Sequence, residues 1–399
     1  MIGAAHLMMR GASGPVQPKG LFAWGINWPN GQLGLGDVIP RSSPTQVGSL
    51  TDWSAVEGRL SGNQDNWSCA TYLIKTDNTL WACGGNQTGE LGCGDRITRS
   101  SPVQVGSGTD WSQISAGANG DASELGDNTV AAIKTTGSLW TWGGKGGMGY
   151  SNKAMYGRPA PDSLYSSPVQ VGALLDWAKI AITHNTMCAI KTDGTLWAWG
   201  MGNNGQLGIP DRVTRSSPCQ VGASSSWSKI TGCQGFYDLN GFLAIRNDKT
   251  LWAWGSNIDY GNLGLGDRTP RSSPIQVGSA TDWEQVNAGD GHVIAIRTGG
   301  TLWAWGYNVY GQLGLGNRTH YSSPVQVGTD TNWSKVYTSA YSSFAIKTNG
   351  TLWAWGNNAN GQLGLGNRDQ RSSPVQVGAG TNWTGLSIGG SGWILGVRT

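Results

Sequence analysis

The chain has 399 residues, of which 64 are glycine and 22 are tryptophan, while only 13% are charged. This composition excludes a disordered chain, which would be rich in charge and poor in aromatic residues, and it excludes a collagen-like chain, because the glycines have no three-residue period. The net charge of +3 is too small to indicate binding to a specific nucleic acid or to an anionic membrane.

The N-terminal segment, MIGAAHLMMRGASGPVQPKG at 1–20, is predicted to be an arm. It has no basic start and only a short apolar run, so we do not interpret it as a secretory signal. No segment of the chain approaches the ~20 consecutive apolar residues of a membrane span, and we expect no membrane insertion. An arm so rich in Gly, Pro and Ala frays when it is alone. We therefore expect the protein's own surface or a neighbour in an assembly to hold it.

From residue 21 onward the sequence repeats. The element L-[WF]-x-[WC]-G begins at Leu21 and recurs at intervals of 50 to 59 residues until Leu352, in seven copies. Each copy is followed by S-S-P, then Q-V-G, then a lone tryptophan. Self-similarity with a fixed period indicates an array of supersecondary units.

The unit that starts at Trp283 shows the four strands predicted for each copy. WEQVNAG and HVIAIRT form the first two, at 283–289 and 292–298. A Gly-Gly turn, which suits a tight hairpin, leads to TLWAWG at 301–306. SPVQVG at 323–328 is the fourth, and its proline suits an outer strand. No helical pattern of useful length is present.

The third strand indicates how these sheets pack. Trp303 and Trp305 share one face, while Leu302 and Ala304 share the other, so both faces are apolar. A sheet buried on both faces has another sheet on each side, and radial stacking of small sheets makes a β-propeller. We predict an all-β fold: a seven-bladed β-propeller with four-stranded antiparallel blades.

The order of the strands predicts how the ring closes. The chain enters at a third strand, LFAWG at 21–25, and ends on a second strand, WILGVRT at 393–399. One blade is therefore composite, with its outer strands from the N-terminus and its inner strands from the C-terminus, which removes exposed strand edges. The predicted domains are the arm, 1–20, and the propeller, 21–399.

The repeated pattern A-I-K-T-[DN]-G-T-L-W-A-W-G-x-N-x-x-G-Q-L-G-L-G-[DN]-R resembles the regulator of chromosome condensation repeat family over residues 21–399. The resemblance implies a seven-bladed propeller, and details such as S-S-P-V-Q-V-G look more like prokaryotic and phage members. Known members exchange nucleotide on a small nuclear GTPase, bind chromatin, sense ultraviolet-B light or inhibit a β-lactamase. The family's G-x-x-H survives only at 289–292, the photoreceptor's G-W-R-H-T cluster is missing, and there is no basic tail. These departures weigh against the exchange-factor and photoreceptor functions.

Conspicuous residue types are interpreted as structural. The glycines of GQLGLG lack the G-K-[ST] of a phosphate-binding loop, so we expect them to shape turns, and we expect the tryptophans to pack blade against blade. The six cysteines have no C-x-x-C pair; Cys83, Cys93 and Cys219 stand where other repeats have apolar residues, as small hydrophobes in a reducing compartment would. The four histidines are scattered. We predict no enzyme, no cofactor and no metal site.

Arginines recur in the pattern [DN]-R-x-x-R-S-S-P. One interpretation is that they form salt links to neighbouring aspartates or bind backbone carbonyls. The alternative is a positively charged rim for an anionic partner, formed by Arg41, Arg99, Arg215, Arg271 and Arg371.

The connections between strands predict a binding face. Those between first and second strands and between third and fourth strands are long, lie on one face, and carry insertions at 116–129 and 144–165. Tyrosine, tryptophan and methionine are common interface anchors. The predicted partner-binding residues are Met148, Tyr150, Met155, Tyr156, Tyr165, Trp28, Trp67, Tyr260 and Tyr310. The alternative is that these loops merely cover the blades.

These observations predict a non-enzymatic interaction or structural module that binds protein partners within a large assembly. One version is a virion or cell-surface component anchored through its N-terminal arm. The alternative is a soluble regulator of one partner protein, such as an enzyme inhibitor or an exchange factor for a small GTPase. A virion or the cytoplasm is the favoured location.

Overall fold

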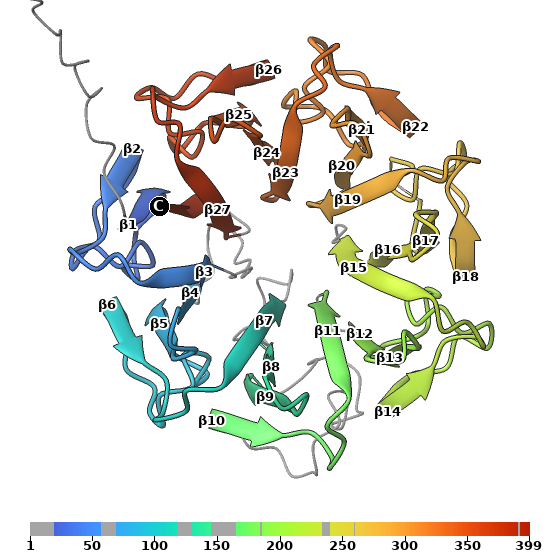
Figure 1. The fold of residues 1–399 in the computed structure, drawn as a ribbon, viewed down its shortest axis with the longest axis horizontal. Coiled ribbons are helices and arrows are strands. Elements are labelled where there is room, and N and C mark those ends of the chain that lie inside the picture. The colour runs from blue at the N-terminus through green and yellow to red at the C-terminus, as the bar shows by residue number, and fades with distance from the viewer. Residues whose placement is uncertain are drawn as a thin grey trace, which may run out of the picture.

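The computed structural model describes residues 20–56, 69–117, 129–144, 165–183, 186–233, 240–258, 260–389 and 392–399. These residues form 28 β-strands, arranged as seven four-stranded antiparallel sheets, and they contain no helix. The sheets stand radially around a central axis as the blades of a propeller (Figure 1). The predicted fold class is confirmed.

The strands of each blade are given from the centre of the ring outward, with the blades numbered along the chain. Blade 1 contains β27 (Trp383–Ile388), β28 (Trp393–Arg398), β1 (Gly20–Gly25) and β2 (Arg41–Gln46). Blade 2 contains β3 (Trp53–Val56), β4 (Ala70–Lys75), β5 (Leu80–Gly84) and β6 (Arg99–Gln104). Blade 3 contains β7 (Trp111–Gly117), β8 (Thr129–Lys134), β9 (Leu139–Gly143) and β10 (Tyr165–Gln170). Blade 4 contains β11 (Trp177–Ile182), β12 (Thr186–Lys191), β13 (Leu196–Gly200) and β14 (Arg215–Gln220).

The remaining blades follow the same order. Blade 5 contains β15 (Trp227–Cys233), β16 (Gly241–Arg246), β17 (Leu251–Gly255) and β18 (Arg271–Gln276). Blade 6 contains β19 (Trp283–Ala288), β20 (His292–Arg297), β21 (Leu302–Gly306) and β22 (Tyr321–Gln326). Blade 7 contains β23 (Trp333–Thr338), β24 (Ser342–Lys347), β25 (Leu352–Gly356) and β26 (Arg371–Gln376).

Blade 1 is the composite blade that the sequence predicts. Strand β1 pairs with β28 in antiparallel register, from Gly20 opposite Arg398 to Gly25 opposite Trp393. In the other blades a tight turn joins the second strand to the third at this position. In blade 1 the two ends of the described chain lie there instead. Residues 1–19 lie outside the described residues, so the arm stays a prediction.

The fourth strand begins earlier than predicted. In blade 6 it covers Tyr321–Gln326 rather than 323–328. The register shifts between Ala304, which lies opposite Val325, and Gly306, which lies opposite Tyr321. This irregularity brings the Ser-Ser-Pro segment into the strand. The proline lies inside the strand, where the outer edge of the blade tolerates its missing N–H.

The two large residues of the third strands, which are both tryptophan in blades 3 to 7, differ in environment. Trp305 is completely buried between blades, as predicted. Trp81, at the first of the two positions in blade 2, is only half-buried and packs within its own blade against Trp53, contrary to the prediction. There Lys75 Nζ lies 4.5 Å from the centroid of Trp81 and 5.1 Å from that of Trp53, and 3.2 Å from a carboxylate oxygen of Asp52. Equivalent cations lie between two aromatic rings in the other six blades: Lys134, Lys191, Arg246, Arg297, Lys347 and Arg398.

The second tryptophan and the glycine-rich loop of the preceding blade join neighbouring blades. Trp305 Nε1 donates a hydrogen bond of 3.0 Å to the carbonyl of Asn262 in blade 5. Gly264 has a φ of +75°, and a Cβ there would lie 2.7 Å from Trp305 Nε1. Only glycine allows both the left-handed backbone and this close approach to the indole. The structural interpretation of the glycines is confirmed, and we call this contact the clasp.

The clasp recurs around most of the ring. The indole N–H donates to a carbonyl of the preceding blade in the pairs Trp24–Gln362, Trp142–Glu90, Trp254–Gln206 and Trp355–Gln312. At the junction of blades 1 and 2, Cys83 replaces the tryptophan, and its Sγ lies 3.7 Å from the carbonyl of Gln32. Burial raises the pKa of the Cys83 thiol to about 12. None of the six cysteines is part of a disulfide bond.

The junction of blades 3 and 4 differs. Trp199 is 0% exposed, yet no described residue accepts a hydrogen bond from its Nε1. The connection that supplies the clasp elsewhere is here the insertion that follows β9. Residues 145–164 of that insertion lie outside the described residues.

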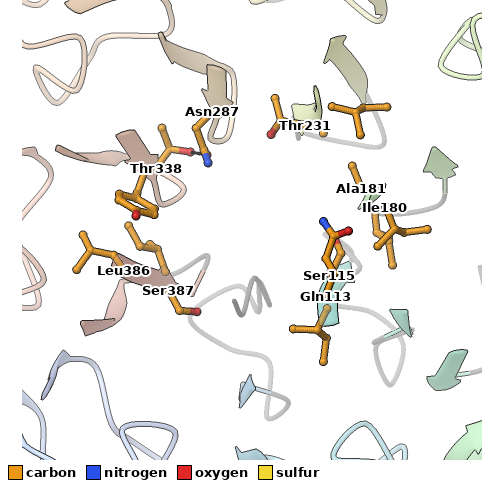
Figure 2. A pocket seen from close by; sticks show the side chains of 15 residues that line it. Gln113, Ser115, Ile180, Ala181, Thr231, Asn287, Thr338, Leu386 and Ser387 are labelled. Carbon is orange, nitrogen blue, oxygen red and sulfur yellow. Dashed lines mark hydrogen bonds between the residues drawn. The ribbon is translucent and has the colours of Figure 1, made fainter. Parts of the chain in front are cut away.

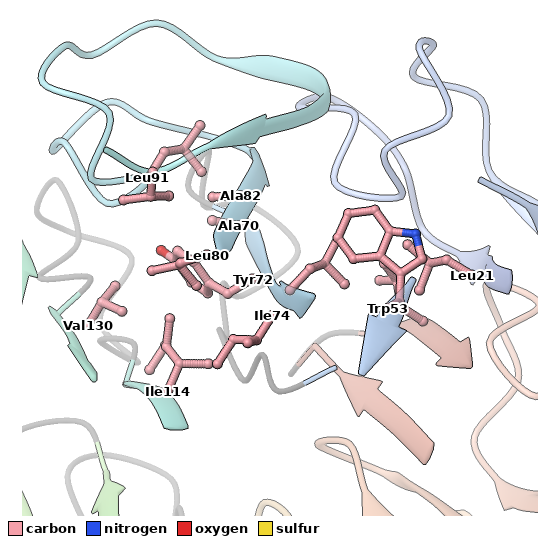
Figure 3. Packing of buried hydrophobic residues seen from close by; sticks show 14 of the residues in the cluster. Leu21, Trp53, Ala70, Tyr72, Ile74, Leu80, Ala82, Leu91, Ile114 and Val130 are labelled. Carbon is pink, nitrogen blue, oxygen red and sulfur yellow. The ribbon is translucent and has the colours of Figure 1, made fainter. Parts of the chain in front are cut away.

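The loops also contribute to the apolar core. Figure 3 shows Leu91, from the connection between β5 and β6, beside Ala82 of its own blade, in one cluster with Leu80 and with Val130 of blade 3. Tyr72 lies in the same cluster, and its hydroxyl donates a 2.6 Å hydrogen bond to the carbonyl of Glu90. These connections are therefore packed parts of the ring.

Candidate interaction face

The two faces of the ring carry different connections. Because neighbouring strands of a blade are antiparallel, the first-to-second and third-to-fourth connections of every blade end on one face. We call it the long-loop face; the connection from β21 to β22, 307–320, is one example. The short-turn face carries the turns between second and third strands, such as 298–301, and the crossings between blades.

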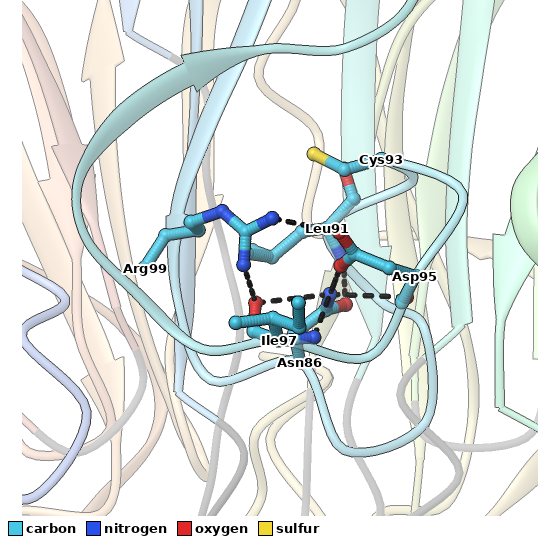
Figure 4. A network of polar contacts seen from close by, with 6 residues as sticks. All are labelled: Asn86, Leu91, Cys93, Asp95, Ile97 and Arg99. Atoms are coloured by element: carbon cyan, nitrogen blue, oxygen red, sulfur yellow. Dashed lines mark hydrogen bonds and ion pairs between the residues drawn. The ribbon is translucent and has the colours of Figure 1, made fainter.

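A polar network fixes each regular loop on the long-loop face. In blade 2, Asn86 Nδ2 donates to Asp95 Oδ1 at 3.0 Å, while Asn86 Oδ1 accepts the N–H of Leu91 at 2.9 Å (Figure 4). Asp95 Oδ1 also accepts the N–H of Ile97 at 3.0 Å. Arg99 donates to Asp95 Oδ2 and to the carbonyl of Ile97, both at 2.7 Å. The Ile97 N–H and the Arg99 guanidinium hold the pKa of Asp95 below its ordinary value.

The arginines proposed as an anionic rim take part in these networks. Arg41 lies 2.6 Å from a carboxylate oxygen of Asp37, and Arg271 lies 2.5 Å from one of Asp267. The remaining ion pairs of the series are Arg99–Asp95, Arg215–Asp211 and Arg371–Asp369. The predicted salt links are present, and an anionic partner would have to compete with the aspartates.

The networks hold apolar side chains at the loop tips. Ile97 is 61% exposed, although its N–H and its carbonyl are both hydrogen-bonded within the loop. Ile39 in blade 1 has the same contacts and is 60% exposed. Among the described residues, the other exposed large apolar residues in connections of this face are Trp28, Val38, Val213, Ile258 and Val309. The long-loop face thus presents apolar groups on loops that are rigidly held.

A group of aromatic side chains lies across blades 5, 6 and 7. The ring centroids of Tyr260 and Tyr307 are 4.4 Å apart, and those of Tyr310 and Tyr341 are 5.2 Å apart. His320 stacks on Tyr307 at 5.3 Å, with 13° between the rings. All five side chains are half-buried. We call these five residues the tyrosine cluster.

The environment favours the neutral forms of three members of the tyrosine cluster, His320, Tyr307 and Tyr341. Burial lowers the pKa of His320, and the charge of Arg268 lowers it further. His320 Nδ1 accepts the N–H of Asn308 at 2.9 Å, so its remaining proton is on Nε2. Burial raises the pKa of Tyr307 and, more strongly, that of Tyr341, where the carboxylate of Asp290 adds to the effect.

The structure brings together only some of the predicted partner-binding residues. Tyr260 and Tyr310 belong to the tyrosine cluster. Trp28, in the connection from β1 to β2, is 60% exposed, and Tyr165 begins β10; both lie in other blades (Figure 1). The remaining predicted residues lie outside the described ones: Met148, Tyr150, Met155, Tyr156 and Trp67.

Sequence reasoning missed three members of the cluster. Tyr307 follows the third strand directly, where two other repeats have Ser256 and Asn357. Tyr341 lies just before a second strand, and His320 just before a fourth strand. Each departs from the repeat, which is the available signal, but the spacing does not reveal that three blades bring these side chains together.

The centre of the ring contains a cavity. A cavity of about 220 Å³ lies on the axis, lined by inner strands of six blades (Figure 2). Its polar lining includes Gln113, Ser115 and Thr231, and Thr338 Oγ1 donates to Asn287 Oδ1 at 2.7 Å. The described lining contains no carboxylate, histidine or cysteine. Nowhere in the described ranges do three His, Cys, Asp or Glu side chains gather as metal ligands would. Within those ranges, no helix has the length and apolar character that crossing a bilayer requires.

Comparison with curated proteins gives distant relatives. The ultraviolet-B receptor UVR8 of Arabidopsis thaliana is 31% identical over 244 residues, which is 60% of this chain and 51% of that protein. The E3 ubiquitin-protein ligase HERC2 of Mus musculus is 26% identical over 291 residues, 72% of this chain but 6% of the ligase. The chain thus spans about half of the first relative and a small part of the second.

Solved structures share the fold at lower identity. Prp20p from Saccharomyces cerevisiae has a TM-score of 0.78 at 19% identity, covering 96% of this chain and 92% of that chain. Human WBSCR16 has a TM-score of 0.75 at 19% identity, covering 96% and 99%. The RCC1-like domain family matches residues 21–395, almost all of the propeller that the strands describe. With its seven repeats and their four-stranded blades, this chain belongs to the RCC1-like domain family.

Proposed function

We propose that the protein is a non-enzymatic binding module that engages a protein partner through its long-loop face. The observation that carries this proposal is the concentration there of exposed apolar loop tips and of the half-buried tyrosine cluster. Rigid aromatic and apolar groups bind at a low entropic cost, because they are already ordered. The structural neighbour Prp20p is described with binding properties to Gsp1p and histones, and in another structure it is bound to Kap60. Partner binding by a propeller of this shape therefore has precedents.

A structural version of this function makes the protein a virion or cell-surface component held by residues 1–20. The position of Gly20 supports it, because this residue pairs with Arg398 at the short-turn face. An arm leaving from Gly20 would attach the ring by one face and leave the long-loop face accessible. The other version is a soluble regulator, such as an enzyme inhibitor or an exchange factor, which needs no attachment.

The decisive experiment is affinity capture from the native source with the intact chain and two variants. Tyr310→Ala combined with Ile97→Ser changes the long-loop face, whereas Leu175→Ser, at an exposed residue of a crossing on the short-turn face, is the matched control. A partner that binds the intact chain and the control but not the double variant supports the proposal. Equal capture by all three folded proteins refutes it.

Deletion of residues 1–20 separates the two versions. A structural component should leave its large assembly when the arm is removed, while a soluble regulator should bind its partner unchanged. Size-exclusion chromatography of the native complex distinguishes these outcomes.

A further inference from the structure

On the long-loop face, the connection from β19 to β20 lies against the tyrosine cluster. Residues 289–291 connect β19 to β20. Gly291 has a φ of +75°, and a Cβ there would lie 3.4 Å from Tyr307 Cβ and 3.5 Å from Tyr260 Cδ2. The carbonyl of Gly291 accepts the N–H of Tyr307 at 2.8 Å. The backbone of this connection therefore fits closely against two rings of the cluster.

The same connection places a carboxylate at the cluster. The N–H of Asp290 donates to the carbonyl of Ala340 at 3.1 Å, which fixes Asp290 beside the residue before Tyr341. The negative charge of Asp290 acts on the phenol of Tyr341. The positive charge of Arg268 acts instead on His320, and the Arg268 side chain is exposed to solvent. The cluster thus has an acidic side, next to Tyr341, and a solvated basic side, next to His320.

Aromatic rings with an adjacent carboxylate attract cations. A cation over an aromatic face gains about 0.5–1 kcal/mol at an exposed site and about 2 kcal/mol or more when water is excluded. This chain uses the combination within its own blades, as the contact of Lys75 with two indoles and Asp52 shows. Phenols are neutral at physiological pH, and the raised pKa values of Tyr307 and Tyr341 move their ionisation further from that range.

We propose that the tyrosine cluster and Asp290 bind one basic side chain, arginine or lysine, of the partner protein. This rests on the proposed function, since it assumes that the long-loop face binds a protein. The basic group would lie over the rings of Tyr310 and Tyr341, with its charge toward Asp290. Half-buried aromatic residues that receive a charged anchor are typical hot spots of protein interfaces.

The test uses the intact chain labelled with 3-fluorotyrosine and probes of known chemistry. N-acetyl-arginine amide and N-acetyl-lysine amide are titrated while fluorine NMR signals are followed, with those of the cluster assigned by single Tyr→Phe changes. Both probes should shift the signals of Tyr310 or Tyr341 in a saturable way. N-acetyl-glutamine amide, which has no charge, should bind at least about 3-fold more weakly, as expected from the lost cation–π energy.

Two variants, each with a matched control, test whether the probes bind at the tyrosine cluster and Asp290. Asp290→Asn should weaken binding of the arginine probe about 3-fold or more, whereas Asp330→Asn, which removes an equally charged group from the short-turn face, should leave it unchanged. Tyr310→Leu should weaken it similarly, while Tyr310→Phe, which keeps the ring face, should not. Equal binding of arginine and glutamine probes, or no effect of either Asp290→Asn or Tyr310→Leu in a folded protein, overturns the proposal.

The partner-capture assay then distinguishes failure of the basic-anchor proposal from failure of the proposed function. If capture of the partner is lost with Tyr310→Ala plus Ile97→Ser but is unaffected by Asp290→Asn, the face binds a protein and the basic anchor is wrong. If capture survives all of these changes, the proposed function itself fails.

Discussion

The junction between blades 6 and 7 and the junction between blades 3 and 4 show what holds this ring together. In the first, Trp355 donates to the carbonyl of Gln312 at 2.9 Å, with Gly314 against the indole. In the second, Trp199 is equally buried, but no described residue accepts its N–H. Apolar packing is present at both junctions, whereas among the described residues the hydrogen-bonded clasp is found only between blades 6 and 7. The clasp adds a directional contact to the apolar burial of the indole.

The largest expected effect comes from breaking a clasp sterically. Gly314→Val introduces a β-branched residue at a φ of +73°, with its Cβ only 2.8 Å from Trp355 Nε1. Left-handed strain and overpacking together should destabilise the protein by about 3–5 kcal/mol, measured by urea unfolding. Gly328→Val is the control, because Gly328 has a φ of +60° but no atom near its added Cβ. Equal costs for the two variants would show that the clasp contributes nothing.

A gentler change compares the two indoles directly. Trp355→Phe removes one of two donors to the carbonyl of Gln312, which also accepts from Ser343 Oγ at 2.7 Å, whereas Trp199→Phe removes an N–H that no described residue accepts. Since both changes remove similar volume, Trp355→Phe should be more destabilising by about 0.5–1.5 kcal/mol, measured by the same unfolding assay. The comparison fails if Trp199→Phe proves the more costly of the two.

Grafting should sharpen the comparison by making the two junctions alike. Residues 144–165 are replaced by NNANGQLGLGNRDQR, the loop of blade 7 with its following arginine. If the graft forms a clasp, Trp199→Phe in the grafted chain should cost about 1 kcal/mol more than in the natural chain. An unchanged cost would mean that the loop sequence alone does not carry the clasp. Partner capture by the same graft shows whether the insertion takes part in binding.

The smallest expected effect concerns the networks behind the loops. The pKa of Asp95 is lowered in the folded state, so its contribution to stability is present above the ordinary value near 3.8 and is lost as the pH falls through the lower folded pKa. The urea midpoint should therefore decline as the pH falls below about 4. Asp95→Asn should flatten part of this decline, because the amide does not titrate. An identical pH dependence in the variant would exclude this network as a source of acid sensitivity.

Much of the fold could be predicted because the blades repeat. Alternation of Trp303 and Trp305 with Leu302 and Ala304 indicates a sheet that is buried on both faces, and the chain order predicts the composite blade. The start of the fourth strand could not be predicted, because it depends on a shift of register between two strands. The packing of Trp81 within its own blade could not be predicted either, since the cation that stacks on it comes from another strand.

The candidate site was less accessible from sequence. Tyr260 and Tyr310 could be singled out as aromatic residues in long loops. Their partners Tyr307 and Tyr341 come from different connections, and only the angle between successive blades brings these rings within contact distance. Asp290 resembles an ordinary loop acid until its effect on Tyr341 is seen.

The closure of blade 1 has a mechanical consequence. Strand β1 lies antiparallel to β28, and Gly20 pairs with Arg398 at one end of the ladder. Force applied between the two chain ends would peel this ladder apart, one residue pair after another. Force between an arm upstream of Gly20 and a partner on the long-loop face would instead run along the strands and load all the pairs at once in shear. A ring tethered by its N-terminus and pulled by its partner is thus held by the stronger of the two geometries.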